Sequence, residues 1–266
     1  KKGLKRKKEV NGIIDCRILM VDEKTKRGYI VETKDKGGIK MENILYCGDN
    51  LEVLQKEIDE ESVDLIYIDP PFFSHKKYEV VWGDEAEMRS FEDRWEGGIE
   101  NYIAWMRPRV EAMHKVLKPT GSFYLHCDWH ANAHLRIMMD EIFGTKNFRN
   151  EIIWHYRRWS AATNNFQRMH DTIFWYSKSK DYVFTKPLQS YAHPEMIEDT
   201  VRKVIKGKLQ RVKKPNGTYV KRKKDYKGVV MHDVWNDINF IPPTGKERLG
   251  YPTQKPEALL ERIINS

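Results

Sequence analysis

The segment "DLIYIDPPFF", residues 64–73, places one carboxylate on a rigid turn after an apolar run. Asp69 is followed by Pro70 and Pro71, which fix the backbone and offer carbonyl oxygens without competing N–H donors. The Asp69 carboxylate and the Pro70 carbonyl are two neighbouring acceptors, which suits the two hydrogens of an exocyclic amino group. Phe72 adds an aromatic face on which a planar base could stack. An amino group held in this way is a better nucleophile toward an activated methyl group.

The same turn also has a purely structural interpretation. In that interpretation Asp-Pro-Pro only ends a strand, and Phe72 and Phe73 pack in the core. The turn taken alone leaves both interpretations open.

Three histidines, His126, His130 and His134, form a second group that could do chemistry. His130 and His134 have the i, i+4 spacing of metal ligands on one helix face. No Glu follows in the zincin pattern, and on a strand Cys127 points to the opposite side from His126. We therefore predict no metal site, and we expect His126 and Asp128 to line the crevice beside Asp69.

A third group mixes cations with aromatic rings in the segment "RRWSAATNNFQRMHD". This mixture suits a loop that touches phosphates and unstacked bases, and an ordinary surface loop is the alternative. The candidate DNA-contacting residues in this segment are Arg157, Arg158, Trp159 and Arg168.

These residues must be positioned by regular elements, and the pattern alternates between strands and helices. Ligands of open α/β sheets bind beyond the carboxyl ends of the strands, so Asp69 should lie at such an end. The alternation predicts an α/β fold with a doubly wound sheet. Strands are predicted within residues 43–50, 63–71, 122–128, 150–156 and 171–179, and helices within 51–58, 102–121, 130–144 and from Pro256 onward.

Positive charge is concentrated between Asp199 and Gly228, where twelve Lys and Arg stand against two Asp, a local charge of +10. The chain of 266 residues carries +8, so the remainder sums to −2. Such a patch suits a polyanion, most often nucleic acid, and a solvated lysine-rich hairpin is the alternative. The candidate DNA-contacting residues of this patch are Arg211, Lys213, Lys214, Arg222 and Lys223.

Composition indicates the class of protein and its surroundings. Cys16, Cys47 and Cys127 are far apart, and no run reaches the ~18 apolar residues of a membrane span. We expect a soluble protein of a reducing compartment, the cytoplasm. Residues 1–40 read as a small N-terminal β extension, and residues 185–231 as an insertion.

The order of motifs resembles that of the β-class DNA amino-methyltransferases. "DPPF" is similar to their catalytic motif, Asp/Asn/Ser-Pro-Pro-Tyr/Phe, which in this class precedes the target-recognition region. "NILYCGDNLEVLQ", "KPTGSFYLHCDWHANAHLRIMMDEIFG", "MHDTIFWYSKSKDYVF" and "YPTQKPEALLERII" are similar to other segments of the class in the same order. The resemblance covers roughly residues 41–185 and 232–266. It implies a Rossmann-like methyltransferase domain at 41–184 and 232–266, with 185–231 as the target-recognition insertion.

The resemblance also implies roles for single residues. Asp69, Pro70, Pro71 and Phe72 would form the catalytic turn that holds and stacks the flipped base. The cofactor would be S-adenosyl-L-methionine, with Asp49, Asn50, Asp69, Thr253, Gln254 and Lys255 as its binding residues. The substrate would be double-stranded DNA.

The first residue of the motif bears on the target base. Members whose motif begins with Asp mostly methylate adenine N6, so a site-specific adenine-N6 methyltransferase is expected. Cytosine-N4 methylation and a non-catalytic DNA-binding relative stay open, as do a homodimer and a restriction-endonuclease partner. Phe72 replaces the commoner Tyr and retains the stacking face. The glycine-rich cofactor loop of the family does not occur in these residues and is expected shortly after Ser266.

Overall fold

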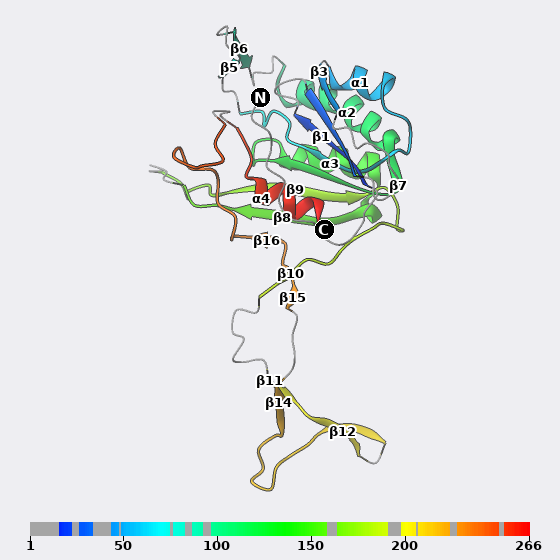
Figure 1. The fold of residues 1–266 in the computed structure, drawn as a ribbon, viewed down its shortest axis with the longest axis vertical. Coiled ribbons are helices and arrows are strands. Elements are labelled where there is room, and N and C mark those ends of the chain that lie inside the picture. Colours follow the sequence, from blue (N-terminus) through cyan, green and yellow to red (C-terminus); the bar gives the residue numbers. More distant parts are fainter. Residues whose placement is uncertain are drawn as a thin grey trace. The chain divides into compact units, whose positions relative to one another are not determined.

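The structure is a computed structural model (Figure 1). The residues that it describes are 16–22, 27–33, 44–47, 49–74, 77–82, 87–92, 97–158, 164–190, 198–205, 207–223, 228–249 and 253–266. The chain divides into two compact units, Lys1–Val183 with Asp233–Ile264, and Phe184–His232 with Asn265–Ser266. Each unit is described separately.

The first unit is built on an eight-stranded mixed sheet with the order β16-β8-β9-β7-β4-β1-β2-β3. Strand β4 lies between β1 and β7 and is parallel to both, while β9 is antiparallel to β7 and β8. The strands are β1 (Cys16–Asp22), β2 (Arg27–Thr33), β3 (Ile44–Cys47), β4 (Val63–Ile68), β7 (Leu117–Cys127), β8 (Phe148–His155), β9 (His170–Ser177) and β16 (Val234–Trp235). A separate pair consists of β5 (Lys77–Trp82) and β6 (Glu87–Glu92).

Helices lie on both faces of this sheet. They are α1 (Asn50–Lys56), α2 (Gly98–Val116), α3 (Asn132–Phe143) and α4 (Glu257–Ile264), with a short 3-10 helix, η1 (Thr145–Asn147). In Figure 1, α1, α2 and α3 lie together on one side, and α4 lies over β8 and β9. Buried residues of α1, α2 and α3 form one cluster with β4, β7 and β9, whereas the buried Leu259 and Ile263 of α4 are not part of it. The predicted doubly wound α/β fold is confirmed.

The predicted helix within 102–121 ends earlier than expected. Helix α2 stops at Val116, and β7 begins at Leu117. The cause is Pro119, since the residue before a proline is disfavoured in the helical conformation. The other predicted ends agree better, because Gly144 caps α3 and Leu259 N–H donates to the Pro256 carbonyl at the start of α4.

Strands β1 and β2 come from the predicted N-terminal extension. Strand β1 pairs with β4 over Ile18–Val21, and β2 pairs with β3, so both belong to the eight-stranded sheet. The assignment of residues 1–40 to a domain of their own stays a prediction.

The second unit consists of short antiparallel pairs. They are β10 (Leu188–Gln189) with β15 (Val229–Val230), β11 (Glu198–Thr200) with β14 (Lys221–Lys223), and β12 (Arg202–Ile205) with β13 (Lys208–Arg211). The turn predicted at Pro215–Thr218 is present, because Lys214 N–H donates to Thr218 O at 2.6 Å and Gly217 has a φ of 81°. Among the helices that the structure describes, none combines the length and apolar character needed to cross a bilayer.

Alternating residues of the central strands face different surroundings. Ile66, Phe123 and Phe174 belong to the cluster beneath α1–α3. Their neighbours Tyr67 and His126 are hydrogen-bonded to each other outside that cluster. Because side chains alternate along a strand, the second face of the sheet carries a separate set of groups.

Candidate active site

The turn after β4 is anchored to helix α2. Pro70 and Pro71 are buried, and the Tyr102 hydroxyl donates to the Pro71 carbonyl at 2.7 Å. Phe73 adopts a φ of 60°, uncommon for a side chain of this size, and its ring lies 5.7 Å from that of Tyr102. Backbone strain of this kind persists only where the surroundings enforce it. The turn is therefore held in one conformation, with Asp69 at the carboxyl end of the strand.

Asp69 forms an ion pair with Lys255, a residue 186 positions later in the chain. The distance from Lys255 Nζ to Asp69 Oδ2 is 2.6 Å, and the two side chains are 11% and 13% exposed. The same ammonium group donates to the Thr253 carbonyl at 3.3 Å and lies 5.2 Å from the centre of the Phe72 ring. Lys255 therefore joins the segment before α4 to the predicted catalytic turn.

Behind Asp69 lies a buried chain of hydrogen bonds that links three strands of the sheet. Tyr67 Oη is 2.7 Å from His126 Nδ1, and His126 Nε2 is 3.2 Å from Asp171 Oδ2. The Tyr156 hydroxyl donates to Asp171 Oδ1 at 2.9 Å. His126 Nδ1 also lies 4.0 Å from Asp69 Oδ1. His126 is fully buried, so its imidazole is held by these neighbours and by contacts with the Phe72 and Trp154 rings.

The protonation states along this chain follow from its surroundings. Burial by itself raises the pKa of Asp171, but the hydrogen bonds from His126 and Tyr156 and the charges of His126 and Lys255 outweigh it, so the pKa lies below its usual value. Burial, together with the charge of Asp171, raises the pKa of Tyr156. Asp171 is therefore a carboxylate at neutral pH, and Tyr156 keeps the proton that it donates.

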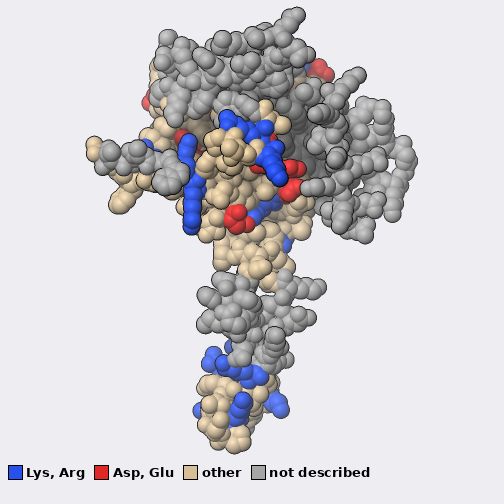
Figure 2. All heavy atoms as spheres, turned by 60° about the vertical axis from the view of Figure 1, so that its left-hand side comes forward, with Lys and Arg blue, Asp and Glu red and all other residues tan. Residues whose placement is uncertain are grey.

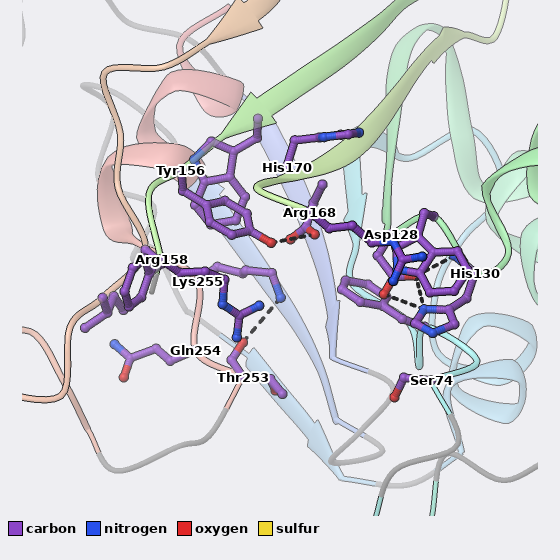
Figure 3. A pocket seen from close by; sticks show the side chains of 16 residues that line it. Ser74, Asp128, His130, Tyr156, Arg158, Arg168, His170, Thr253, Gln254 and Lys255 are labelled. Atoms are coloured by element: carbon purple, nitrogen blue, oxygen red, sulfur yellow. Dashed lines mark hydrogen bonds and ion pairs between the residues drawn. The ribbon is translucent and has the colours of Figure 1, made fainter. Parts of the chain in front are cut away.

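A cavity of about 340 Å³ opens beside these groups (Figure 3). Its aromatic walls are Phe72, Trp129, Trp154, Tyr156 and Phe240, its cations are Arg158, Arg168 and Lys255, and its acids are Asp128 and Asp171. In Figure 3, Tyr156, Arg158 and Lys255 lie on one side of the cavity, and Asp128 and His130 lie on the other. Aromatic rings set among polar and charged groups suit a planar ligand that also carries polar groups.

One rim of the cavity is a stack of charged and aromatic side chains. The Arg168 guanidinium lies 3.8 Å from the centre of the Trp129 ring, and the Trp129 and His130 rings are 3.8 Å apart. His130 Nδ1 is 2.7 Å from Asp128 Oδ2. Burial raises the pKa of Asp128, and its hydrogen bonds with His130 oppose that change.

Comparisons with known proteins fit this geometry. A sequence model of a family described as DNA methylase matches residues 63–266. The chain belongs to this DNA methylase family. The family consists of S-adenosylmethionine-dependent enzymes with amino groups of adenine or cytosine as targets.

Individual relatives are similar over most of the chain. This chain is 28% identical over 235 residues to the Type II methyltransferase M.BglII of Bacillus subtilis. The alignment covers 84% of this chain and 56% of that protein. This chain is 26% identical over 224 residues to the Type II methyltransferase M.HpaI of Haemophilus parainfluenzae, covering 84% and 59%. The chain thus spans somewhat more than half the length of these relatives. Among solved structures, the PvuII DNA methyltransferase (cytosine-N4-specific) aligns with a TM-score of 0.49 and 16% identity, covering 83% of this chain and 68% of that one.

The structure brings some of the predicted family residues together at this site. Asp69 is bonded to Lys255, and Phe72, Thr253, Gln254 and Lys255 line the cavity. The Gln254 side chain spans its own loop, since it accepts from Leu249 N–H and donates to the Glu247 carbonyl, both at 2.8 Å. The predicted crevice residues His126 and Asp128 lie behind Asp69 and in the cavity wall, respectively.

Asp49 and Asn50, which were predicted to bind cofactor, are not among the residues that line this cavity. Asp49 caps α1 by accepting from Leu51 N–H at 2.9 Å. Arg109 on α2 holds both residues, at 2.6 Å from Asp49 Oδ2 and 3.0 Å from Asn50 Oδ1. Sequence reasoning did not identify Arg109, because nothing in a helical pattern marks an arginine that reaches another helix.

The predicted DNA-contacting residues occur in both units. In the first unit, Arg158 and Arg168 line the cavity, Arg157 is exposed, and Trp159 lies outside the described residues. In the second unit, Arg211 and Lys213 flank the Tyr219 ring at 5.6 and 5.7 Å, and Lys214 is exposed. Arg222 and Lys223 belong to β14. Figure 2 shows Lys and Arg side chains over much of the described surface of this second unit.

Sequence reasoning missed Tyr67, Tyr156 and Asp171. Each is a polar residue in or directly after an otherwise apolar strand. Such a residue must find a partner when buried, and this was the available signal. The sequence alone did not show that the three share one face of the sheet.

Proposed function

We propose that this chain is the catalytic part of a site-specific DNA methyltransferase that transfers a methyl group from S-adenosyl-L-methionine to adenine N6. The observation that carries the proposal is the anchored Asp-Pro-Pro-Phe turn, in which Phe72 lines the cavity and the Asp69 carboxylate is bonded to Lys255, another residue of the cavity wall. The family membership supports the reaction class. The Asp at the start of the motif favours adenine over cytosine.

The roles within the turn follow from its chemistry. Asp69 and the Pro70 carbonyl accept the two hydrogens of the target amino group, and Phe72 supports the plane of the base. The cavity receives the base after it has rotated out of the duplex, at a cost of a few kcal/mol. Trp154, Tyr156 and Phe240 supply the remaining flat walls.

Lys255 occupies the place at Asp69 that the amino group is proposed to take. Its ammonium group donates to Asp69 Oδ2 and lies over the Phe72 ring. Binding of the base therefore requires Lys255 to share or leave this acceptor. Asp69 orients the amine, and the amine does not need to lose a proton before the transfer.

The cofactor supplies the activated methyl group on a sulfonium sulfur. Lys255 and Thr253 fit the amino-acid end of such a molecule, because they combine a cation and a hydroxyl at the cavity wall. Gln254 holds the loop that carries them. Asp49 and Asn50 are proposed for the adenosine end, with Arg109 fixing their orientation.

The cations are proposed to bind the DNA backbone. Arg158 and Arg168 are at the cavity, where the flipped nucleotide brings its phosphates. The second unit, with Arg211, Lys213 and Lys214, is proposed as the target-recognition insertion. A protein that methylates chromosomal DNA would be located in the cytoplasm, at the nucleoid. A homodimer and an endonuclease partner stay open.

The test uses the full-length protein with S-adenosylmethionine labelled in the methyl group and with DNA of mixed sequence. After the reaction the DNA is digested to nucleosides, and the labelled species is identified. Label in N6-methyldeoxyadenosine supports the proposal, and label in N4-methyldeoxycytidine assigns the chain to the alternative base.

A third outcome is loss of chemistry with retention of binding. No label in either nucleoside, together with salt-sensitive DNA binding, would make the chain a non-catalytic DNA-binding relative. Asp69→Ala is the control without the side-chain acceptor, and it should give no label while DNA binding is retained.

A further inference from the structure

We propose that His126, held by Asp171, takes up the proton that the target amine loses, with Asp69 as the intermediate carrier. The inference rests on the methyltransferase function proposed above. It assigns a role to the buried pair of His126 and Asp171, which the proposed function leaves without one.

The geometry sets the direction of the relay. Asp171 is a carboxylate and can only accept, so His126 Nε2 carries the hydrogen of their 3.2 Å contact. A neutral His126 therefore has its lone pair on Nδ1, where it accepts from the Tyr67 hydroxyl at 2.7 Å. This nitrogen is also the one nearest Asp69, at 4.0 Å from Oδ1. The gap is about 1 Å beyond hydrogen-bond range, and catalytic contacts often tighten only when substrate is bound.

The second oxygen of Asp69 is already engaged. Lys255 donates to Oδ2 at 2.6 Å, so Oδ1 is the oxygen that faces the imidazole. The two carboxylate oxygens therefore have different neighbours, a cation on one side and a proton acceptor on the other.

Titratable groups from several elements surround His126. Tyr67 on β4, Asp69 after β4, Asp171 on β9, Tyr156 after β8 and Lys255 before α4 are the titratable groups around it. Asp69 lies on the Nδ1 side of the imidazole and Asp171 on its Nε2 side. An imidazolium formed during the reaction therefore lies between two carboxylates, which stabilise its charge.

The reaction balances as follows. The lone pair of the amine nitrogen forms a bond to the methyl carbon, while the carbon–sulfur bond breaks and its electron pair stays on sulfur. The nitrogen, now positively charged, releases a proton to Asp69 Oδ1, and the electron pair of that N–H bond returns to nitrogen. Asp69 passes the proton to His126 Nδ1 and becomes a carboxylate again, while the Tyr67 hydroxyl, which donated to that nitrogen, turns to accept from the new N–H. The imidazolium lies between Asp69 and Asp171 until it releases the proton to solvent.

The test is the pH profile of single-turnover methyl transfer between about pH 5 and pH 9. In the unaltered protein the rate should fall on the acid side, because an imidazole that already carries a proton on Nδ1 cannot accept one from Asp69. His126→Asn should lower the maximal rate by about 10²-fold, in the range of proton-transfer catalysis. It should also abolish the fall in rate at low pH, which is the acid limb of the profile. A purely structural role would lower the rate by one factor at every pH.

Two variants of the supporting groups give opposite shifts. Asp171→Asn removes the anion that stabilises the imidazolium, so the acid limb should move to lower pH. Tyr156→Phe removes a donor from Asp171 and makes it a stronger acceptor for His126, so the limb should move to higher pH. These two variants also decide the matter if His126→Asn does not fold.

Profiles that keep the midpoint of the unaltered protein in all three variants would overturn the relay. An unaltered protein that forms no methylated nucleoside at any pH would instead refute the proposed function on which the relay depends. The two failures are therefore distinguishable.

Discussion

Adjacent residues of β7 belong to two different environments. Phe123 and Leu125 are fully buried against α2 and α3 in a single apolar cluster. His126, one position later and equally buried, is bonded to Tyr67 and Asp171 on the opposite face. The same alternation separates Ile66 from Tyr67 on β4.

The difference shows how one sheet serves stability and chemistry. The helix-covered face depends on volume and shape, and such cores tolerate changes that conserve both. On the other face each polar group is satisfied by the next, so removal of one leaves its partner buried without a bond. Substitutions on the two faces should therefore differ in which property they change.

The largest effect is expected from Asp69→Ala on the polar face. It removes the proposed acceptor of the amino group, and methyl transfer should fall by at least about 10³-fold. DNA binding should be largely retained. The measurements are single-turnover methylation and a DNA-binding titration at fixed salt.

Lys255→Met is the control for the broken ion pair, because removing one partner of a buried pair is itself costly. Because Lys255 is also proposed to bind the cofactor, the comparison uses stability: if Asp69→Ala loses activity only in proportion to the folded fraction that it loses, as judged against the unfolding of Lys255→Met, Asp69 acts structurally. Loss of DNA binding together with activity in Asp69→Ala would lead to the same conclusion.

The next effect is expected on the helix-covered face. Leu125→Ala should lower the free energy of unfolding by about 2–5 kcal/mol, because a fully buried side chain leaves a cavity. Urea unfolding measures this change. The rate of methyl transfer per folded molecule should stay near that of the unaltered protein. A large drop in that rate with unchanged stability would contradict the separation of the two faces.

Removing positive charges from the second unit should weaken DNA binding without changing the rate of methyl transfer. Replacing Arg211, Lys213 and Lys214 by Gln should weaken DNA binding. The slope of log binding constant against log salt concentration should become less negative by roughly 0.9 for each DNA phosphate that is no longer neutralised. Transfer at saturating DNA should change little. Replacing the exposed Lys146 of the first unit by Gln is a matched control that should leave the slope unchanged.

The smallest effects concern stability against pH. Burial lowers the pKa of His114 on α2, and the charge of Lys178 adds to this. A histidine whose pKa is lowered by folding contributes stability above its unfolded pKa of about 6.5. This contribution is lost as the pH falls through the pKa of the folded state. His114→Gln should therefore reduce the loss of stability just below pH 6.5.

Asp171 on the polar face has a different window. Its pKa is also lowered, so its contribution is present above about pH 3.8 and is lost only below it. Asp171→Asn should alter the acid dependence in that lower range alone. Urea unfolding midpoints of the His114 and Asp171 variants, measured across both pH ranges, test these two predictions. If both variants changed stability in the same pH range, the assignment of the two pKa changes would be contradicted.

The residues of the local elements were predictable because their signals are local. Buried strands, the Asp-Pro-Pro turn, the Gly144 stop and the Pro215–Thr218 turn each depend on a few consecutive side chains. The order of these segments also indicated the DNA methylase family. Helix α2 was expected to close at Lys118-Pro119, and it ends slightly earlier, at Val116, because Leu117 already enters β7; its start at Gly98, before Tyr102, was not predicted.

By itself the sequence determined the approximate place of most central strands and helices, the acceptor turn at Asp69, and the concentration of charge in the insertion. Only the tertiary structure decided which distant groups meet. Lys255 reaches Asp69 across 186 residues, Asp171 reaches His126 across 45, and Arg109 rather than the cavity holds Asp49. Hydrophobic periodicity specifies that a strand is buried, but not its neighbour or its register. These contacts depend on the order β9-β7-β4, which is set by the packing of the whole sheet.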